Sequence, residues 1–156
     1  MEGFTIALIG AAFAFALAGF GSVVGTGITG QAGSGVVSED PQRFISMLIL
    51  QALPGTQGFY GFVALFLVIN KVAGVDAITS NQGWQIVLAC APVGLVGLLS
   101  AIFQGRVCAA GATQIAKQPG TLASAMMFAI VVETYALLGF VGTVVLLARV
   151  SVGGGA

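Results

Sequence analysis

Glu133 is a single carboxylate inside a long apolar segment. It is the only charged residue between Thr121 and Ala148. An ionised, unpaired carboxylate deep in a membrane is costly, so such residues mark ion paths and proton relays. The alternative is a protonated glutamic acid that is hydrogen-bonded within a helix bundle. The polar groups that share the depth of Glu133 decide between these interpretations.

Three other polar residues are expected at that depth. The sequence has two short polar turns, each marked by a proline, Pro41 and Pro119. Glu133 follows the second proline, and Gln104 precedes it, at nearly equal spacing. Thr56 and Gln57 follow the first proline at almost the same spacing. At ~1.5 Å of helical rise per residue, these spacings place all four side chains roughly 21–24 Å from the turns, near the middle of a bilayer.

Two further residues add to this polar level. Tyr60 lies one helical turn from Thr56 and Gln57, on the same helix face, where its phenol can hold the carboxylate. Pro54 has no N–H to donate, so its ring disturbs the preceding turn and leaves a backbone carbonyl in need of a partner. Carboxylate, amide, hydroxyl and carbonyl oxygens suit a hard cation of low charge such as Na⁺. A proton needs only the carboxylate and one partner, so the additional oxygens favour sodium over the proton.

The composition predicts an all-α integral membrane protein. Of 156 residues, 58% are hydrophobic and only 6% are charged, against about 25% charged in a soluble domain. Four long uncharged stretches predict four transmembrane helices; they are Gly3–Ser38, Phe44–Asn70, Ala77–Gly105 and Thr134–Ala148. We interpret the first as a mature span and not as a cleaved leader, because it is long and begins beside an acidic residue. Zero net charge without a basic patch makes nucleic acid an unsuitable partner.

The residue inventory limits the possible chemistry. The chain has no histidine, so carboxylate, amide, hydroxyl and backbone oxygens must do any ion binding. Cys90 and Cys108 fit no metal-binding or redox spacing and are expected to be buried apolar thiols.

The chain is a tandem duplication of one helical hairpin. A shift by half the chain length, called the repeat shift below, aligns its two halves without a gap over most of their length. The matched pairs include Gly19 with Gly97, Ser22 with Ser100, Gly27 with Gly105, Pro41 with Pro119, Ser46 with Ser124 and Thr56 with Thr134. So many matches in one register indicate a repeat with a boundary between residues 1–78 and 79–156. Because the two hairpins have the same direction, this is a parallel repeat. Glu133 aligns with Gly55, so one carboxylate serves two hairpins.

The glycine-rich first helix of each hairpin predicts assembly. Repeats bury their sides against neighbours, and identical copies in a membrane close into rings. Small side chains let helices approach closely, so we place these helices on the inner wall of a homo-oligomeric ring, with the bulkier second helices outside. A leucine at Gly25 or Gly27 is then expected to break the ring before it unfolds the protomer. A four-helix bundle within one chain is the alternative.

Three strings together resemble the rotor-ring proteolipid of V-type rotary ATPases, particularly the bacterial sodium-pumping forms. They are LPGTQGFYGF (Leu53 to Phe62), FQGRVCAAG (Phe103 to Gly111) and VVETYALLGF (Val131 to Phe140). The resemblance covers essentially the whole chain. It implies a ring in the membrane sector that ATP hydrolysis, in a separate soluble sector, turns against a stator. It also implies a chain that binds no nucleotide and is not itself an enzyme.

The resemblance also implies roles for single residues. Glu133 is expected to carry the ion, Thr56, Gln57 and Gln104 to be side-chain ligands, Leu53 to offer its carbonyl oxygen, and Tyr60 to hydrogen-bond Glu133. The implied partners are identical copies of the chain, a stator subunit that presents an arginine, central-stalk subunits and lipid. The implied location is a bacterial cell membrane.

Two other classes of membrane protein are alternatives. A small ion-coupled antiporter also relies on a lone membrane glutamate, but it would need neither a parallel duplication nor several oxygens at one depth. In a passive pore the glycine-rich helices would line a channel; such a pore should conduct alone, whereas a rotor ring should be plugged by lipid.

Overall fold

The computed structural model describes residues 2–153, and in this range four helical segments are long and apolar enough to cross a membrane. The first is helix α1 (Glu2–Glu39). The second is interrupted: a 3₁₀ turn (Pro41–Arg43) leads into α2 (Phe44–Ala52), and a second 3₁₀ turn (Leu53–Gly55) leads into α3 (Thr56–Val72). The third is α4 (Ser80–Lys117) and the fourth is α5 (Leu122–Arg149). The predicted all-α class with four spans is confirmed.

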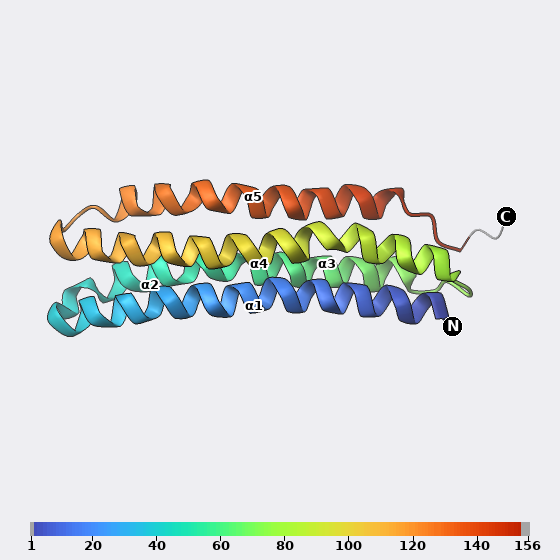
Figure 1. Ribbon diagram of the computed structural model, residues 1–156, viewed down its shortest axis with the longest axis horizontal. Helices are drawn as coiled ribbons and strands as arrows, with labels where there is room; N and C mark the ends of the chain where they lie inside the picture. The colour runs from blue at the N-terminus through green and yellow to red at the C-terminus, as the bar shows by residue number, and fades with distance from the viewer. Residues whose placement is uncertain (1, 154–156) are drawn as a thin grey trace.

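The helices lie side by side along one long axis, with both proline turns at one end (Figure 1). The N-terminus, the end of the described chain and the connection between α3 and α4 lie at the other end (Figure 1). Asp40 shapes the first turn, because its carboxylate accepts the backbone N–H of Gln42 at 3.0 Å and the Arg43 Nε–H at 2.9 Å. The second turn contains Gly120 at φ +90°, a conformation that favours glycine.

The duplication is visible in the helix bounds. Helices α1 and α4 each have 38 residues, and the repeat shift converts the bounds of α1 into those of α4. At a rise of ~1.5 Å per residue each is about 57 Å long, well beyond the roughly 30 Å of a bilayer's hydrocarbon core. The first hairpin comprises α1, α2 and α3, and the second comprises α4 and α5.

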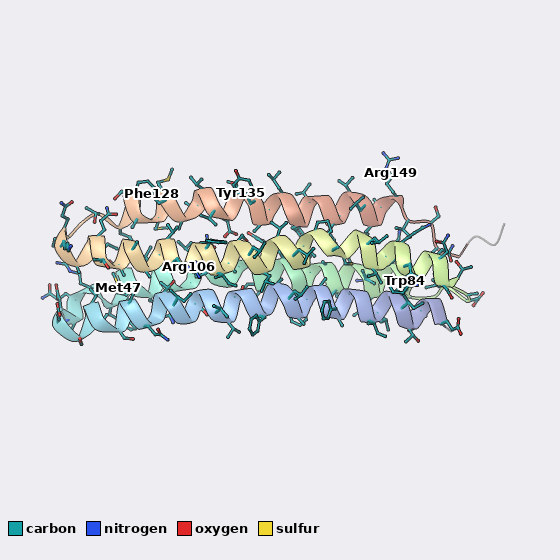
Figure 2. The ribbon with its side chains drawn as sticks, viewed as in Figure 1. Met47, Trp84, Arg106, Phe128, Tyr135 and Arg149 are labelled. Carbon is teal, nitrogen blue, oxygen red and sulfur yellow. The ribbon has the colours of Figure 1, made fainter. Side chains whose placement is uncertain are left out.

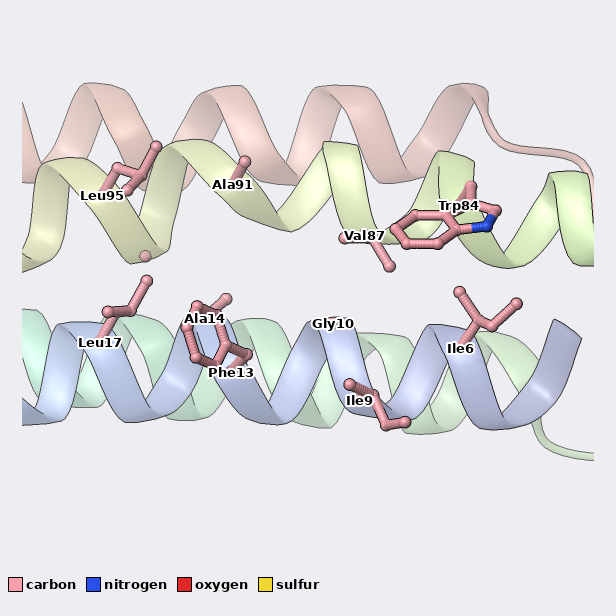
Figure 3. Close-up of a pocket in the computed structure, with 11 residues that line it drawn as sticks. Ile6, Ile9, Gly10, Phe13, Ala14, Leu17, Trp84, Val87, Ala91 and Leu95 are labelled. Carbon is pink, nitrogen blue, oxygen red and sulfur yellow. The ribbon is translucent and has the colours of Figure 1, made fainter. Parts of the chain in front are cut away.

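Small residues bring the backbones of α1 and α4 into contact. A Cβ atom added to Gly21 would lie 2.6 Å from the carbonyl oxygen of Leu98. Glycine at this position therefore permits the close approach. An apolar groove runs along the same pair of helices, between Ile6 and Phe13 of α1 and Trp84 and Leu95 of α4 (Figure 3).

Two apolar clusters fill the interior and a polar layer separates them. The cluster near the termini includes Val68, Ile86 and Val93, and the one near the turns includes Leu50, Cys108 and Ile115. Between them the fully buried side chains of Gln57 and Gln104 face each other. Cys90 and Cys108 are buried free thiols, as predicted.

Candidate ion-binding site

Glu133 of α5 meets three side chains of α3. Its Oε1 accepts the Tyr60 hydroxyl at 2.5 Å, and its Oε2 accepts the Gln57 Nε2–H at 3.1 Å. The Thr56 hydroxyl oxygen lies 2.7 Å from Oε1 and 2.8 Å from Oε2. The site thus joins the two hairpins at the depth at which residue counting placed these side chains.

The Thr56 hydroxyl stands at the centre of a cluster of oxygens. Besides both Glu133 oxygens, the backbone oxygen of Leu53 lies 2.9 Å from it and the Oε1 of Gln57 lies 3.3 Å from it. A hydroxyl has one proton to donate, so it can satisfy only one of these four acceptors at a time. Three of these oxygens also accept other donors, namely the Tyr60 hydroxyl, the Gln57 Nε2–H and the Thr56 N–H. Oxygens gathered this closely around one carboxylate are the kind of ligand that a hard cation takes.

Pro54 shapes the backbone here. The α2 helix ends at Ala52, and the next three residues form a 3₁₀ turn in place of an α-helical one. The missing N–H and the bulk of the proline ring are the cause of this interruption. The Leu53 oxygen accepts the backbone N–H and the hydroxyl of Thr56, which holds it beside the carboxylate.

Gln104 enters the site through Gln57. Its Nε2–H donates to the backbone oxygen of Ala129 at 3.1 Å, and its Oε1 accepts the Gln57 Nε2–H at 2.6 Å. Its amide oxygen is thereby directed at the cluster and not at the lipid. Among the described residues, no hydrogen bond joins Gln104 to Glu133 directly.

Tyr60 is held by packing as well as by its hydroxyl. Its ring stacks on Phe140 of α5 with centroids 5.6 Å apart and an interplanar angle of 25°. Two α5 residues therefore fix Tyr60, Glu133 at the hydroxyl and Phe140 at the ring. This limits the rotation of the phenol and keeps its donor on the carboxylate.

Glu133 is the only formal charge in the cluster, since its contacts are with neutral groups. Arg106, a cation that the sequence places within a span, is exposed on α4, with its guanidinium 5.3 Å from the centroid of the Phe103 ring. In the range 2–153, no three His, Cys, Asp or Glu residues gather to hold a metal ion. A bound cation would therefore depend on one carboxylate and several neutral oxygens.

Sequence reasoning missed three contacts that support the site. These are the Ala129 carbonyl that orients Gln104, the Phe140 ring behind Tyr60, and Ser22, whose Oγ accepts the Gly58 N–H at 2.8 Å. Ser22 had a signal, because its repeat partner Ser100 is also a serine. Phe140 had the same signal, because its repeat partner Phe62 is also a phenylalanine. The Ala129 contact is made by a backbone oxygen, so residue type could not reveal it.

Comparisons with known proteins agree with the duplicated hairpin. The profile of the family described as the C subunit of ATP synthase matches this chain twice, over residues 9–68 and 87–146. A V-type sodium ATPase subunit K from Enterococcus hirae is 42% identical over 139 residues, which cover 89% of this chain and 88% of that protein. An A-type ATP synthase subunit K from Methanocaldococcus jannaschii is 39% identical over 142 residues, which cover 91% of this chain and 61% of that longer protein.

The two profile matches lie in both hairpins and include every residue of the cluster around Glu133. The chain therefore belongs to the family of ATP synthase C subunits, the non-catalytic proteolipids of the membrane rotor.

Proposed function

We propose that this chain is the Na⁺-carrying rotor-ring subunit of a V-type ATPase and that Glu133 carries the ion. The observation that supports this most is the set of four acceptor oxygens around the single hydroxyl of Thr56. Na⁺ would coordinate these oxygens and neutralise the carboxylate. The 42% identity to a protein named as a V-type sodium ATPase subunit supports the same cargo.

The proposed ligands are the carboxylate of Glu133, the side-chain oxygens of Thr56, Gln57 and Gln104, and the carbonyl oxygen of Leu53. The Gln104 Oε1 accepts the Gln57 Nε2–H, and its second lone pair could coordinate the ion. Ion binding and this buried amide hydrogen bond are therefore compatible. Tyr60 would hold the carboxylate in place without touching the ion.

The charge of Glu133 explains how an ion could drive rotation. Occupied, the site is neutral and can pass through lipid; empty and ionised, it is held back by the cost of moving a bare carboxylate out of a polar environment. In this proposal a stator subunit supplies an arginine and two half-channels that exchange the ion. Copies of the chain form the ring, and central-stalk subunits couple it to the ATP-hydrolysing sector.

Two structural proposals accompany this function. Residues 1–78 and 79–156 are the two repeat units, with the ion-carrying glutamate in the second. The repeat boundary would then lie in the connection between α3 and α4. The four spans and the membrane family make this an integral membrane protein, which we assign to a bacterial cell membrane.

A proton is the second candidate cargo, and one observation favours it. Within the described range, every buried side-chain nitrogen and oxygen has a hydrogen-bond partner. A protonated Glu133 could donate to an oxygen of the cluster and complete the same network. The family match favours both rotor alternatives over an antiporter or a passive pore.

Binding of radioactive sodium to the purified full-length protein, with native mass measurement in lipid, tests this function. We expect a ring-sized oligomer that binds one Na⁺ per chain. Glu133→Gln preserves shape but removes the charge, so it should assemble equally and bind no Na⁺. A monomeric mass would contradict the ring. Intact rings whose Glu133→Gln variant still bound Na⁺ would remove this residue from the mechanism.

A further inference from the structure

The contact between the two hairpins predicts the contact between neighbouring chains. Each hairpin has one flank that is buried against the other hairpin and one flank that remains open. Because both hairpins derive from one repeat, the buried flank of one corresponds to the open flank of the other. In a closed ring, the open flank of the second hairpin meets the open flank of the next chain's first hairpin. A residue pair that touches inside the chain therefore identifies, after the repeat shift, a pair between chains. This inference rests on the ring assembly proposed above.

The open flank of the second hairpin carries a groove between α4 and α5, lined by Leu99, Phe103, Val131 and Tyr135. Their repeat counterparts are Gly21, Gly25, Leu53 and Gln57. Gly21 and Gly25 face α4, and Leu53 and Gln57 belong to the cluster around Glu133. The groove is thus the second hairpin's copy of the surface that the first hairpin buries.

The open flank of the first hairpin carries the matching groove. It runs over Phe15, Gly55, Gly58, Phe59 and Phe62 of α1 and the second span. The counterpart of Gly55 is Glu133, and that of Phe62 is Phe140. Both counterparts contact α3 inside the chain. This groove is therefore the first hairpin's copy of the surface that receives Gln57 and Tyr60.

Side-chain sizes on the two open flanks are complementary at the depth of Glu133. On the second hairpin, Tyr135 replaces a glutamine and Phe103 replaces a glycine, so this flank protrudes. On the first hairpin, Gly55 replaces a glutamate and Thr26 replaces Gln104, so this flank is recessed. The glycine leaves room, because a Cβ atom at Gly55 would meet only the Thr26 Cγ2, at 3.7 Å.

The hydroxyl of Tyr135 gives independent evidence for a partner outside the chain. The side chain is 63% exposed and projects from α5 away from the bundle (Figure 2). It lies two residues from Glu133, at mid-membrane depth, and its hydroxyl makes no hydrogen bond to any of residues 2–153. Lipid tails offer no acceptor for a hydroxyl at that level, so a second protein surface must provide one.

We infer that Tyr135 of one protomer inserts into the groove over Gly55 of the next protomer and donates its hydroxyl to Thr26 there. Inside the chain, Gln57 contacts both Glu133 and Gln104, and the repeat shift converts these contacts into Tyr135 with Gly55 and with Thr26. The Thr26 hydroxyl donates to the Ser22 carbonyl at 2.7 Å, which leaves its oxygen free to accept. Each junction between protomers is thus a copy of the ion site that has lost its charge and become a packing contact.

Cysteine cross-linking of the full chain in membranes tests this junction. In a Cys90→Ala, Cys108→Ala background, Tyr135→Cys with Gly55→Cys should give a ladder of covalent oligomers on mild oxidation. Leu137→Cys with Gly55→Cys is the matched control. Leu137 is exposed at nearly the same depth but is the counterpart of Phe59, on the flank nearer α3. The control and each single variant should stay monomeric on a denaturing gel.

A second pair of cysteines tests the same junction without a change at Gly55. The contact of Gly25 with Gly105 converts to Phe103 with Gly27, so Phe103→Cys with Gly27→Cys should also cross-link. Wild-type rings of the expected mass in which neither pair cross-links, or in which the control does so equally, would overturn this junction and leave the rotor function standing. Absence of any ring from the wild-type protein would remove both.

The hydrogen bond has its own readout. Tyr135→Phe and Thr26→Val should each lower the temperature at which the ring dissociates in detergent, and the double variant should lower it no further. Additive effects would show that the two hydroxyls do not interact.

Discussion

The Oγ1 of Thr56 bridges the carboxylate of Glu133, at 2.7 Å from one oxygen and 2.8 Å from the other. Thr56 belongs to the first hairpin and Glu133 to the second, so the candidate site exists only where the two repeats meet. The first repeat has Gly55 at the position that Glu133 occupies in the second, so the single carboxylate of the two repeats lies against oxygens of the other one.

Removal of the Thr56 hydroxyl should weaken Na⁺ binding. Thr56→Val keeps the shape but removes an oxygen, which leaves a buried charged group short of a partner. That loss costs roughly 1–3 kcal/mol, or about 5- to 150-fold in the dissociation constant. Thr56→Ser keeps the oxygen and should remain near wild type. Titration of radioactive sodium on the purified rings measures the difference. Equal affinities in the valine and serine variants would exclude Thr56 as a ligand.

Loss of the Tyr60 hydroxyl should loosen the carboxylate without emptying the site. Tyr60→Phe retains the stacking on Phe140 but removes the donor 2.5 Å from Glu133. We expect about a tenfold rise in the Na⁺ dissociation constant, as for one hydrogen bond to a charged group. Tyr60→Leu, which also loses the stack, should be weaker still. If the phenylalanine variant binds as tightly as wild type, the phenol does not hold the carboxylate.

Gly25 and Gly27 look alike in the sequence but should respond differently to substitution. A Cβ atom at Gly25 would collide with the Ala101 carbonyl and lie 2.8 Å from the Pro54 Cβ, whereas one at Gly27 would meet no atom within 4 Å. The sequence alone predicts that leucine at either position breaks the ring before it unfolds the protomer. The structure supports this order for Gly27 but not for Gly25.

Gly25→Leu should destabilise the protomer itself, while Gly27→Leu should leave the protomer folded and dissociate the ring. Helical content and thermal unfolding in detergent report on the protomer, and native mass reports on the ring. A Gly27→Leu variant that forms intact rings at full yield would contradict the second expectation.

The depth of the site residues could be predicted because helical rise is constant, so residue counts from Pro41 and Pro119 place Thr56, Gln57, Gln104 and Glu133 at one level. Which face each residue occupies could not be predicted as well. Helix α1 is apolar on all sides, so its sequence has no periodic face to read. Its rotation about its own axis depends on close contacts of glycine and alanine with α4. The difference between Gly25 and Gly27 follows from that packing.

Chemical modification of Glu133 can separate sodium from the proton. A hydrophobic carbodiimide reacts only with the protonated acid, and Na⁺ and H⁺ neutralise the same carboxylate, so each should displace the other. For a sodium rotor, labelling should slow as sodium rises, and more sodium should be needed for protection at lower pH.

Gln57→Ala and Gln104→Ala should both shift protection to higher sodium. Gln57 should have the larger effect, because it contacts Glu133 directly and Gln104 does so only through it. Gln114→Ala, at an exposed amide that bonds Ser124 near the turns, is the matched control and should leave protection unchanged. Labelling that follows pH and ignores sodium would mean a proton rotor, in which the amides serve only to join the helices.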